Sequence, residues 1–125
     1  MKELTESDII LNNDGTIYHL GLHKDQIYPT IITVGDPSRV NEVSKYFDSI
    51  DYTNDNREFK AVGGRLGNNQ IMVLSTGIGT DNIDIVLNEI SLLINFDLTS
   101  RTQLSLQKSV RLIRLGTSGS INPSI

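Results

Sequence analysis

The stretch that decides the fold is Thr30-Ile31-Ile32-Thr33-Val34-Gly35-Asp36-Pro37-Ser38-Arg39. Its β-branched run, residues 30–34, stops at a glycine, which predicts a buried strand. Gly35 allows close backbone approach to a ligand, and Asp36 as N-cap with Pro37 at the first helical position predicts a helix. Free N–H groups at a helix start favour an anion, and Arg39 adds a positive charge. The alternative is a plain strand-turn-helix with a surface arginine.

Two further strand-like runs also end in loops of small residues. Residues 70–74 lead into Ser75-Thr76-Gly77-Ile78-Gly79-Thr80, and residues 110–115 lead into Gly116-Thr117-Ser118-Gly119. Between them, apolar side chains recur at helical spacing over residues 83–94. In open α/β sheets, ligands gather at the carboxyl ends of strands. Three such ends, with Arg39 and Arg114, therefore predict one convergent anion site.

The alternation of these runs predicts the fold class. We expect strands near residues 30–34, 57–63, 70–75 and 110–115, and helices near residues 37–47 and 82–94. A turn at Gly67-Asn68-Asn69 predicts a hairpin, so the middle strands should be antiparallel or mixed. Asp81 or Asn82 is the expected N-cap of the second helix. Residues 97–109 should run over the surface, as an irregular excursion or as a helix. Together these elements predict a three-layer α/β/α sandwich with a mixed central sheet.

Composition narrows the classes of function. The 125 residues suffice for one domain with a core, which we divide into a polar N-terminal arm, residues 1–16, and one α/β unit, residues 17–125. A net charge of −4 argues against nucleic-acid binding. The absence of cysteine excludes thiol chemistry, and two histidines make a poor zinc site. With no signal peptide and no membrane-length apolar run, we expect a cytoplasmic protein with no membrane partner.

Five short motifs occur in order along the chain. They are Tyr18-His19-Leu20-Gly21-Leu22, Gly35-Asp36-Pro37-Ser38-Arg39-Val40, Arg57-Glu58-Phe59, Ser75-Thr76-Gly77-Ile78-Gly79 and Arg114-Leu115-Gly116-Thr117-Ser118-Gly119. In order and spacing they resemble the hexameric nucleoside phosphorylases of the uridine phosphorylase type. One such motif is a weak signal, whereas five in sequence are a strong one. The resemblance implies that a nucleoside, with uridine weakly favoured over purine nucleosides, reacts with phosphate to give a free base and ribose 1-phosphate.

The same resemblance implies roles for individual residues. The family's phosphate ligands fall on Gly35, Arg39, Arg57, Arg114 and Thr117. Arg114 and Thr117 are the expected catalytic residues, and Thr117 should also touch the ribose. Arg57 should arrive from a neighbouring subunit, and His19 should reach into the neighbour's ribose pocket. The active site would then belong to a dimer within a homo-oligomer, a hexamer in this family.

A monovalent cation, K⁺, lies between subunits in some members of the family. Its ligands correspond to Glu58, the carbonyl of Ile78 and a position that is usually serine and is Asn82 here. Beyond this ion and phosphate as co-substrate, the resemblance implies no cofactor.

Simpler interpretations compete with these roles. His19 could be an ordinary polar histidine, Arg57 could form a surface ion pair with Glu58, and His23 is expected to be solvated surface. A non-functional interpretation is less easily made for Arg114, because this residue stands in an apolar strand end where an unpaired charge would be costly.

The resemblance covers only the N-terminal half of the family's chains. The Gln-x-Arg segment that binds uracil and the Met-Glu pair that binds ribose do not occur in this sequence. We therefore expect the chain alone to be inactive, as a truncated form of a longer protein or the product of a broken gene. Three functions stay open: a nucleoside phosphorylase, a nucleosidase of the same fold that uses water, and a non-catalytic nucleotide-binding or interaction domain. The arginines at positions 39, 57 and 114 argue against the nucleosidase, since a hydrolase has no anion to hold.

Overall fold

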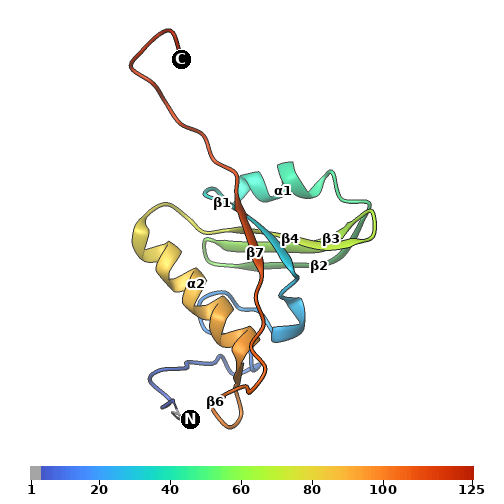
Figure 1. Ribbon diagram of the computed structural model, residues 1–125, viewed down its shortest axis with the longest axis vertical. Coiled ribbons are helices and arrows are strands. Elements are labelled where there is room, and N and C mark those ends of the chain that lie inside the picture. Colours follow the sequence, from blue (N-terminus) through green and yellow to red (C-terminus); the bar gives the residue numbers. More distant parts are fainter. Residues whose placement is uncertain (1–3) are drawn as a thin grey trace.

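A five-stranded mixed sheet forms the centre of the computed structural model, which describes residues 4–125 (Figure 1). Its strand order is β2-β3-β4-β1-β7. The bounds are β1 Thr30–Val34, β2 Ser49–Asn56, β3 Phe59–Leu66, β4 Asn69–Ser75 and β7 Arg111–Arg114. Strands β2, β3 and β4 form an antiparallel meander, whereas β1 pairs parallel with β4 on one side and with β7 on the other. The predicted mixed pairing is confirmed.

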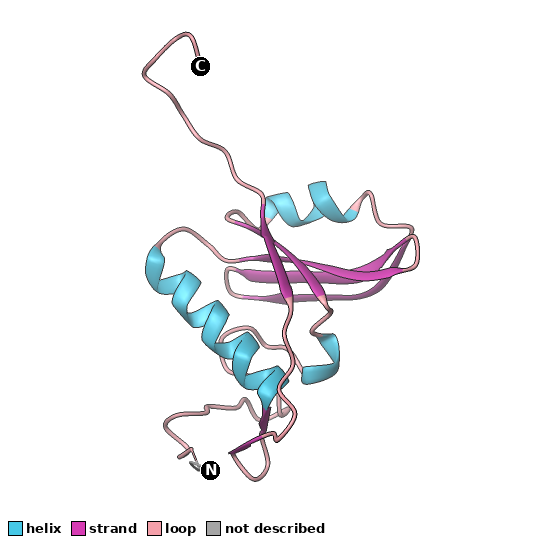
Figure 2. Ribbon diagram, viewed as in Figure 1, coloured by secondary structure: helices cyan, strands magenta, loops and turns pink. Residues whose placement is uncertain are grey.

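One helix covers each face of this sheet (Figure 2). Helix α1 spans Ser38–Ser44 and α2 spans Thr80–Asn95, and a short 3-10 helix, η1, spans Lys24–Gln26. A second, two-stranded sheet pairs β5, Phe96–Asp97, with β6, Thr102–Gln103. The three-layer α/β/α arrangement predicted from the sequence is confirmed.

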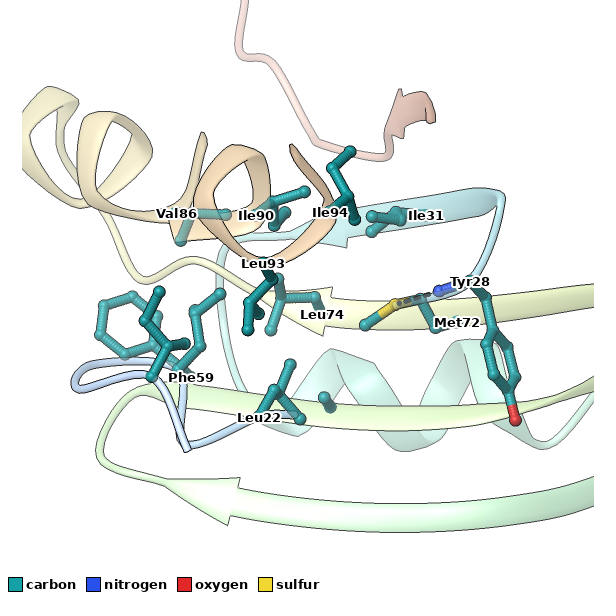
Figure 3. Packing of buried hydrophobic residues seen from close by; sticks show 13 residues of the cluster. Leu22, Tyr28, Ile31, Phe59, Met72, Leu74, Val86, Ile90, Leu93 and Ile94 are labelled. Carbon is teal, nitrogen blue, oxygen red and sulfur yellow. Dashed lines mark hydrogen bonds between the residues drawn. The ribbon is translucent and has the colours of Figure 1, made fainter. Parts of the chain in front are cut away.

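Side chains of β4 divide the core into two parts, because successive residues of a strand point to opposite faces. Met72 and Leu74 pack on the α2 side with Ile90 and Leu93 of that helix (Figure 3). Val73, between them, packs on the α1 side in a smaller cluster with Val34, Val40 and Val62. The regular alternation fixes the register of the sheet, since a shift of one residue would exchange the two faces.

The segment before the sheet is tied to the β5–β6 hairpin. Ile9 is buried, and the Arg101 guanidinium donates to the carbonyl oxygens of Thr5 and Ile9 at 3.1 Å each. The Leu4 N–H donates to the Arg101 carbonyl at 2.9 Å. Among residues 4–125, no helix is both long and apolar enough to cross a membrane.

Several local predictions were wrong. Strand β2 was missed because its residues are mostly polar and its exposed positions carry no apolar alternation. The strand predicted near residues 57–63 begins at Phe59 instead of residue 57, since Arg57 and Glu58 form the turn before it. Residues 97–109 form no helix: part of the β5–β6 hairpin comes first, and residues 104–109 then follow the irregular, largely exposed course that was the other expectation. The N-cap of α2 is Gly79, and neither Asp81 nor Asn82 caps the helix.

The core predicts different responses at two leucines of α2. Leu93 is fully buried, whereas Leu87 is 45% exposed. Leu93→Ala should lower the free energy of unfolding by about 2–5 kcal/mol, because it leaves a cavity against the sheet. Leu87→Ala, the matched control, should cost under about 1 kcal/mol. Urea unfolding measures both values, and equal losses would show that α2 does not pack on this face.

Candidate functional site

Three loops meet at the carboxyl edge of the parallel strands. The backbone ladder continues past the strand ends: the Thr76 N–H donates to the Val34 carbonyl at 2.8 Å, and the Gly77 N–H donates to the Gly35 carbonyl at 2.9 Å. On the other side, the Leu115 N–H donates to the Thr33 carbonyl at 2.9 Å. The loops after β1, β4 and β7 are therefore held at one edge, as the sequence predicted.

An open pocket of about 360 Å³ lies between these loops. Its lining is Gly35, Asp36, Arg39, Ile78, Arg114, Leu115, Gly116 and Thr117. A Cβ atom at Gly35 would lie 3.9 Å from Nη2 of Arg114, so the guanidinium sits close to this glycine. Four of the five residues predicted to bind phosphate thus line the same pocket. The chain after β1 and the end of β7 supply them, and the loop after β4 adds Ile78.

The start of helix α1 does not offer the free N–H groups that the sequence suggested. The Ser38 N–H donates to Oδ1 of Asp36 at 2.8 Å, and the Arg39 N–H donates to the Asp36 carbonyl at 3.0 Å. The Val40 N–H donates to the Pro37 carbonyl at 3.1 Å. With the first donors engaged inside the turn, positive charge in the pocket comes from the two arginines.

Asp36 contributes the opposing charge. Hydrogen bonds from the backbone and side chain of Ser38 lower the pKa of the Asp36 carboxyl, and the nearby Arg39 adds to this effect. The carboxylate is therefore ionised at neutral pH and accounts for one negative charge beside two guanidinium groups. Among residues 4–125, the side chains of Arg39 and Arg114 make no hydrogen bond or ion pair.

Arg114 lies in a different environment from the one predicted. Strand β7 is exposed along its whole length because, within the described chain, only β1 pairs with it. Leu112, Ile113 and Leu115 are each more than 40% exposed, so the expected burial of the arginine charge was wrong. Beyond β7 the chain runs away from the sheet (Figure 1). The exposed guanidinium lines the pocket, so its charge carries little desolvation cost.

Arg57 and His19 lie outside this pocket. Arg57, in the turn between β2 and β3, sits over the Tyr18 ring at 4.9 Å and donates to its hydroxyl at 3.2 Å. Among the described residues no ion pair joins it to Glu58, so the simple surface pair was wrong. His19 contacts the carboxylate of Glu89, with Nδ1 2.8 Å from Oε2. His23 is exposed, as predicted.

Glu89 was missed by the sequence analysis, although the pattern contained a signal. It stands on the apolar stripe of α2, three residues after Val86, and is itself buried. A carboxylate on a buried helix face needs hydrogen-bond donors. Attention to that one charged position would have indicated a polar partner.

Two of the three predicted cation ligands flank Gly77. A Cβ atom at this glycine would lie 2.5 Å from Nδ2 of Asn82 and 3.2 Å from Cγ of Glu58, and Ile78 follows directly. Since Asn82 does not cap α2, its amide is available, and carboxylate, amide and carbonyl oxygens suit a hard monovalent cation. Among residues 4–125, no cluster of three or more His, Cys, Asp or Glu side chains could hold a metal ion.

A larger cavity, of about 740 Å³, lies between η1 and the β5 region. Lys24 and Lys108 line it, but so do Asp25 and Asp97. The charges of the two lysines and the two aspartates cancel, and His23 is the remaining titratable residue of the lining. This cavity therefore suits an anion less well than the pocket of the two arginines does.

Comparison with known proteins agrees with this geometry. Residues 29–125 match the model of the Phosphorylase superfamily. The chain belongs to this superfamily. The resemblance identified from the five motifs is thereby confirmed.

Relatives of known activity match over most of the chain. The uridine phosphorylase of Haemophilus influenzae is 30% identical over 87% of the chain and 38% of its own length. The purine nucleoside phosphorylase of Plasmodium falciparum is 27% identical over 90% of the chain and 40% of its own length. The chain therefore spans about two fifths of the length of the relatives that it matches.

Solved structures give the same picture of the fold. A nucleoside phosphorylase of Trypanosoma brucei, described as showing uridine phosphorylase activity, superposes with a TM-score of 0.82 at 37% identity. The match covers 94% of this chain and 41% of that one. The purine nucleoside phosphorylase of Toxoplasma gondii has a TM-score of 0.70 at 27% identity, over 92% of this chain and 41% of its own.

The packing around Gly77, in the loop after β4, can be tested against Gly67, a glycine with the same left-handed backbone in the turn between β3 and β4. Gly67 has φ 61° with open space around it, and Gly77 has φ 72° with Asn82 and Glu58 in the way. Gly67→Ala should cost about 1–2 kcal/mol from backbone strain alone. Gly77→Ala should cost more, because both side chains must move as well. Urea unfolding compares the two, and equal costs would mean that Glu58 and Asn82 do not converge there.

Proposed function

We propose that the whole protein cleaves a nucleoside by phosphorolysis, with uridine as the favoured substrate. The observation that carries this proposal is the single pocket in which Arg39 and Arg114 face Gly35 and Thr117. Two guanidinium groups in one pocket suit a phosphate, which is both the nucleophile and an anion. The similarity to uridine phosphorylases supports the choice of base.

The reaction balances without a side-chain nucleophile. A phosphate oxygen attacks C1′ of the sugar from the face opposite the base, and the glycosidic C–N bond breaks. The bonding electron pair leaves with the base, which then takes up a proton, and the sugar becomes ribose 1-phosphate with inverted configuration. Arg39 and Arg114 hold the phosphate oxygens, and the Thr117 hydroxyl donates to one of them. The held anion stabilises the positive charge that develops on the sugar.

Residues outside the pocket motivate the proposed assembly. His19 and Arg57 line other surfaces of the chain, so they would serve a site only in a neighbouring copy. We therefore propose a homo-oligomer built from dimers, a hexamer as in the family, with K⁺ held by Glu58, Ile78 and Asn82. The proposed location is the cytoplasm, without nucleic-acid or membrane partners. Phosphate as co-substrate and this ion complete the proposed requirements.

Phosphate dependence separates the proposal from a nucleosidase. Uridine cleavage by the whole protein should require inorganic phosphate and should release ribose 1-phosphate. Base release can be followed by ultraviolet absorbance, and the sugar product by ³¹P NMR. Cleavage at an unchanged rate without phosphate would favour a nucleosidase instead, and no cleavage of any nucleoside would favour a non-catalytic domain.

The two ends of β7 offer a matched pair of variants. Arg114 lines the pocket, whereas Arg111 lies at the other end of the same exposed strand. Arg114→Ala should weaken phosphate binding to this chain roughly tenfold, for one charge-assisted hydrogen bond of about 1.5 kcal/mol in a solvated pocket. Arg39→Ala should have a similar effect.

Arg111→Ala removes the same charge but should leave phosphate affinity unchanged. Calorimetric titration of inorganic phosphate measures all three variants. Equal weakening by Arg111→Ala and Arg114→Ala would show that net charge, and not the pocket, attracts the anion.

A further inference from the structure

Glu89 places a carboxylate at a buried position of helix α2. Its side chain is 11% exposed on a helix face that otherwise packs apolar residues against the sheet. Burial of a carboxylate is costly unless donors satisfy it. Among residues 4–125, every donor to this carboxylate comes from a single place in the chain, residues 19 and 20.

Both carboxylate oxygens are engaged. Oε1 accepts from the His19 N–H at 3.0 Å and from the Leu20 N–H at 2.9 Å. Oε2 lies 2.8 Å from Nδ1 of His19 and 3.2 Å from its backbone nitrogen. An ionised carboxylate can only accept hydrogen bonds, so Nδ1 must carry the hydrogen. The backbone contacts alone would hold the loop, whereas the contact to Nδ1 also selects the form of the ring.

Other contacts restrain the same histidine. Its carbonyl accepts from Nδ2 of Asn56 at 2.7 Å, and its ring meets the rings of Tyr18 and Phe59 edge-on at 4.8 and 6.4 Å between centroids. The side chain remains 30% exposed and lines a pocket of about 190 Å³. With Nδ1 committed, Nε2 is the ring atom left for a ligand.

We propose that Glu89 is the positioning residue of His19. It holds the imidazole with the hydrogen on Nδ1, so that Nε2 presents a lone pair to a hydroxyl of the nucleoside sugar. The part that concerns the sugar rests on the proposed function. The part that concerns the tautomer rests on the Glu89 contacts alone, so the two can be tested separately.

The tautomer can be read in the unchanged chain by ¹⁵N NMR of the imidazole nitrogens. The chain has two histidines, and exposed His23 serves as an internal reference. At a pH where both rings are neutral, His19 should show a protonated Nδ1 and an unprotonated Nε2. His23 should show the mixture of a solvated ring. A His19 spectrum that matches the His23 mixture would overturn the proposal, with no variant required.

Glu89→Gln then separates positioning from loop structure. The glutamine oxygen can still accept from the backbone N–H groups, whereas its NH₂ group would donate to Nδ1. The hydrogen of His19 should therefore move to Nε2, while amide shift dispersion shows an intact fold. Glu6→Gln, the same change at an exposed carboxylate outside this pocket, should leave the tautomer unchanged. An unchanged tautomer in Glu89→Gln would contradict the proposal.

The link to the nucleoside sugar is tested separately, by steady-state kinetics of the assembled protein. Glu89→Gln should raise the KM for nucleoside roughly two- to tenfold, the effect of one hydrogen bond, without changing the KM for phosphate. Glu6→Gln should change neither value. A rise in the phosphate KM alone would overturn the link to the sugar. If no variant or parent protein cleaves nucleosides, the proposed function fails while the tautomer result still decides the role of Glu89.

Discussion

The parallel pairing of β1 with both β4 and β7 is the constraint on which the site depends. β1 contributes only five residues, yet its register aligns Val34 with Ser75 and Thr33 with Arg114. Because the three strands run the same way, their carboxyl ends share one edge, and the ladder extends into the loops. The pocket follows from this pairing: Arg39 comes from the helix after β1, and Arg114 from the end of β7.

The polar residues to which binding roles are assigned lie on two separate parts of the surface. The arginine pocket is open, solvated and positive, which suits an anion that must enter and leave. His19, Glu89 and Arg57 lie on other surfaces, where Glu89 is buried, His19 contacts it and Arg57 is exposed. A phosphorolytic enzyme needs both an anion site and groups for the sugar, so copies of the chain that exchange these surfaces would unite the two.

Much of this arrangement could be predicted from the sequence. The β-branched run of β1, the glycine loops and the apolar stripe of α2 carry strong local signals, so the strand ends and the pocket residues followed. The polar edge strand β2 could not be predicted, because it is held by backbone pairing with β3 and needs no apolar pattern. The exposure of Arg114 and the Glu89–His19 contact depend on tertiary placement that spacing does not encode. The occupied N–H groups beside Asp36 are local turn contacts, which an Asp two residues before Ser38 could have indicated.

The most direct test of the account is a titration of inorganic phosphate into the ¹⁵N-labelled chain, followed through its backbone amide signals. The amides of Gly35, Gly116 and Thr117 should shift together along one binding curve. The amides of Lys24 and Lys108, beside the larger cavity, should stay in place. Shifts confined to those lysines, or absent from the three pocket residues, would contradict the claim that the parallel strand ends form the anion site.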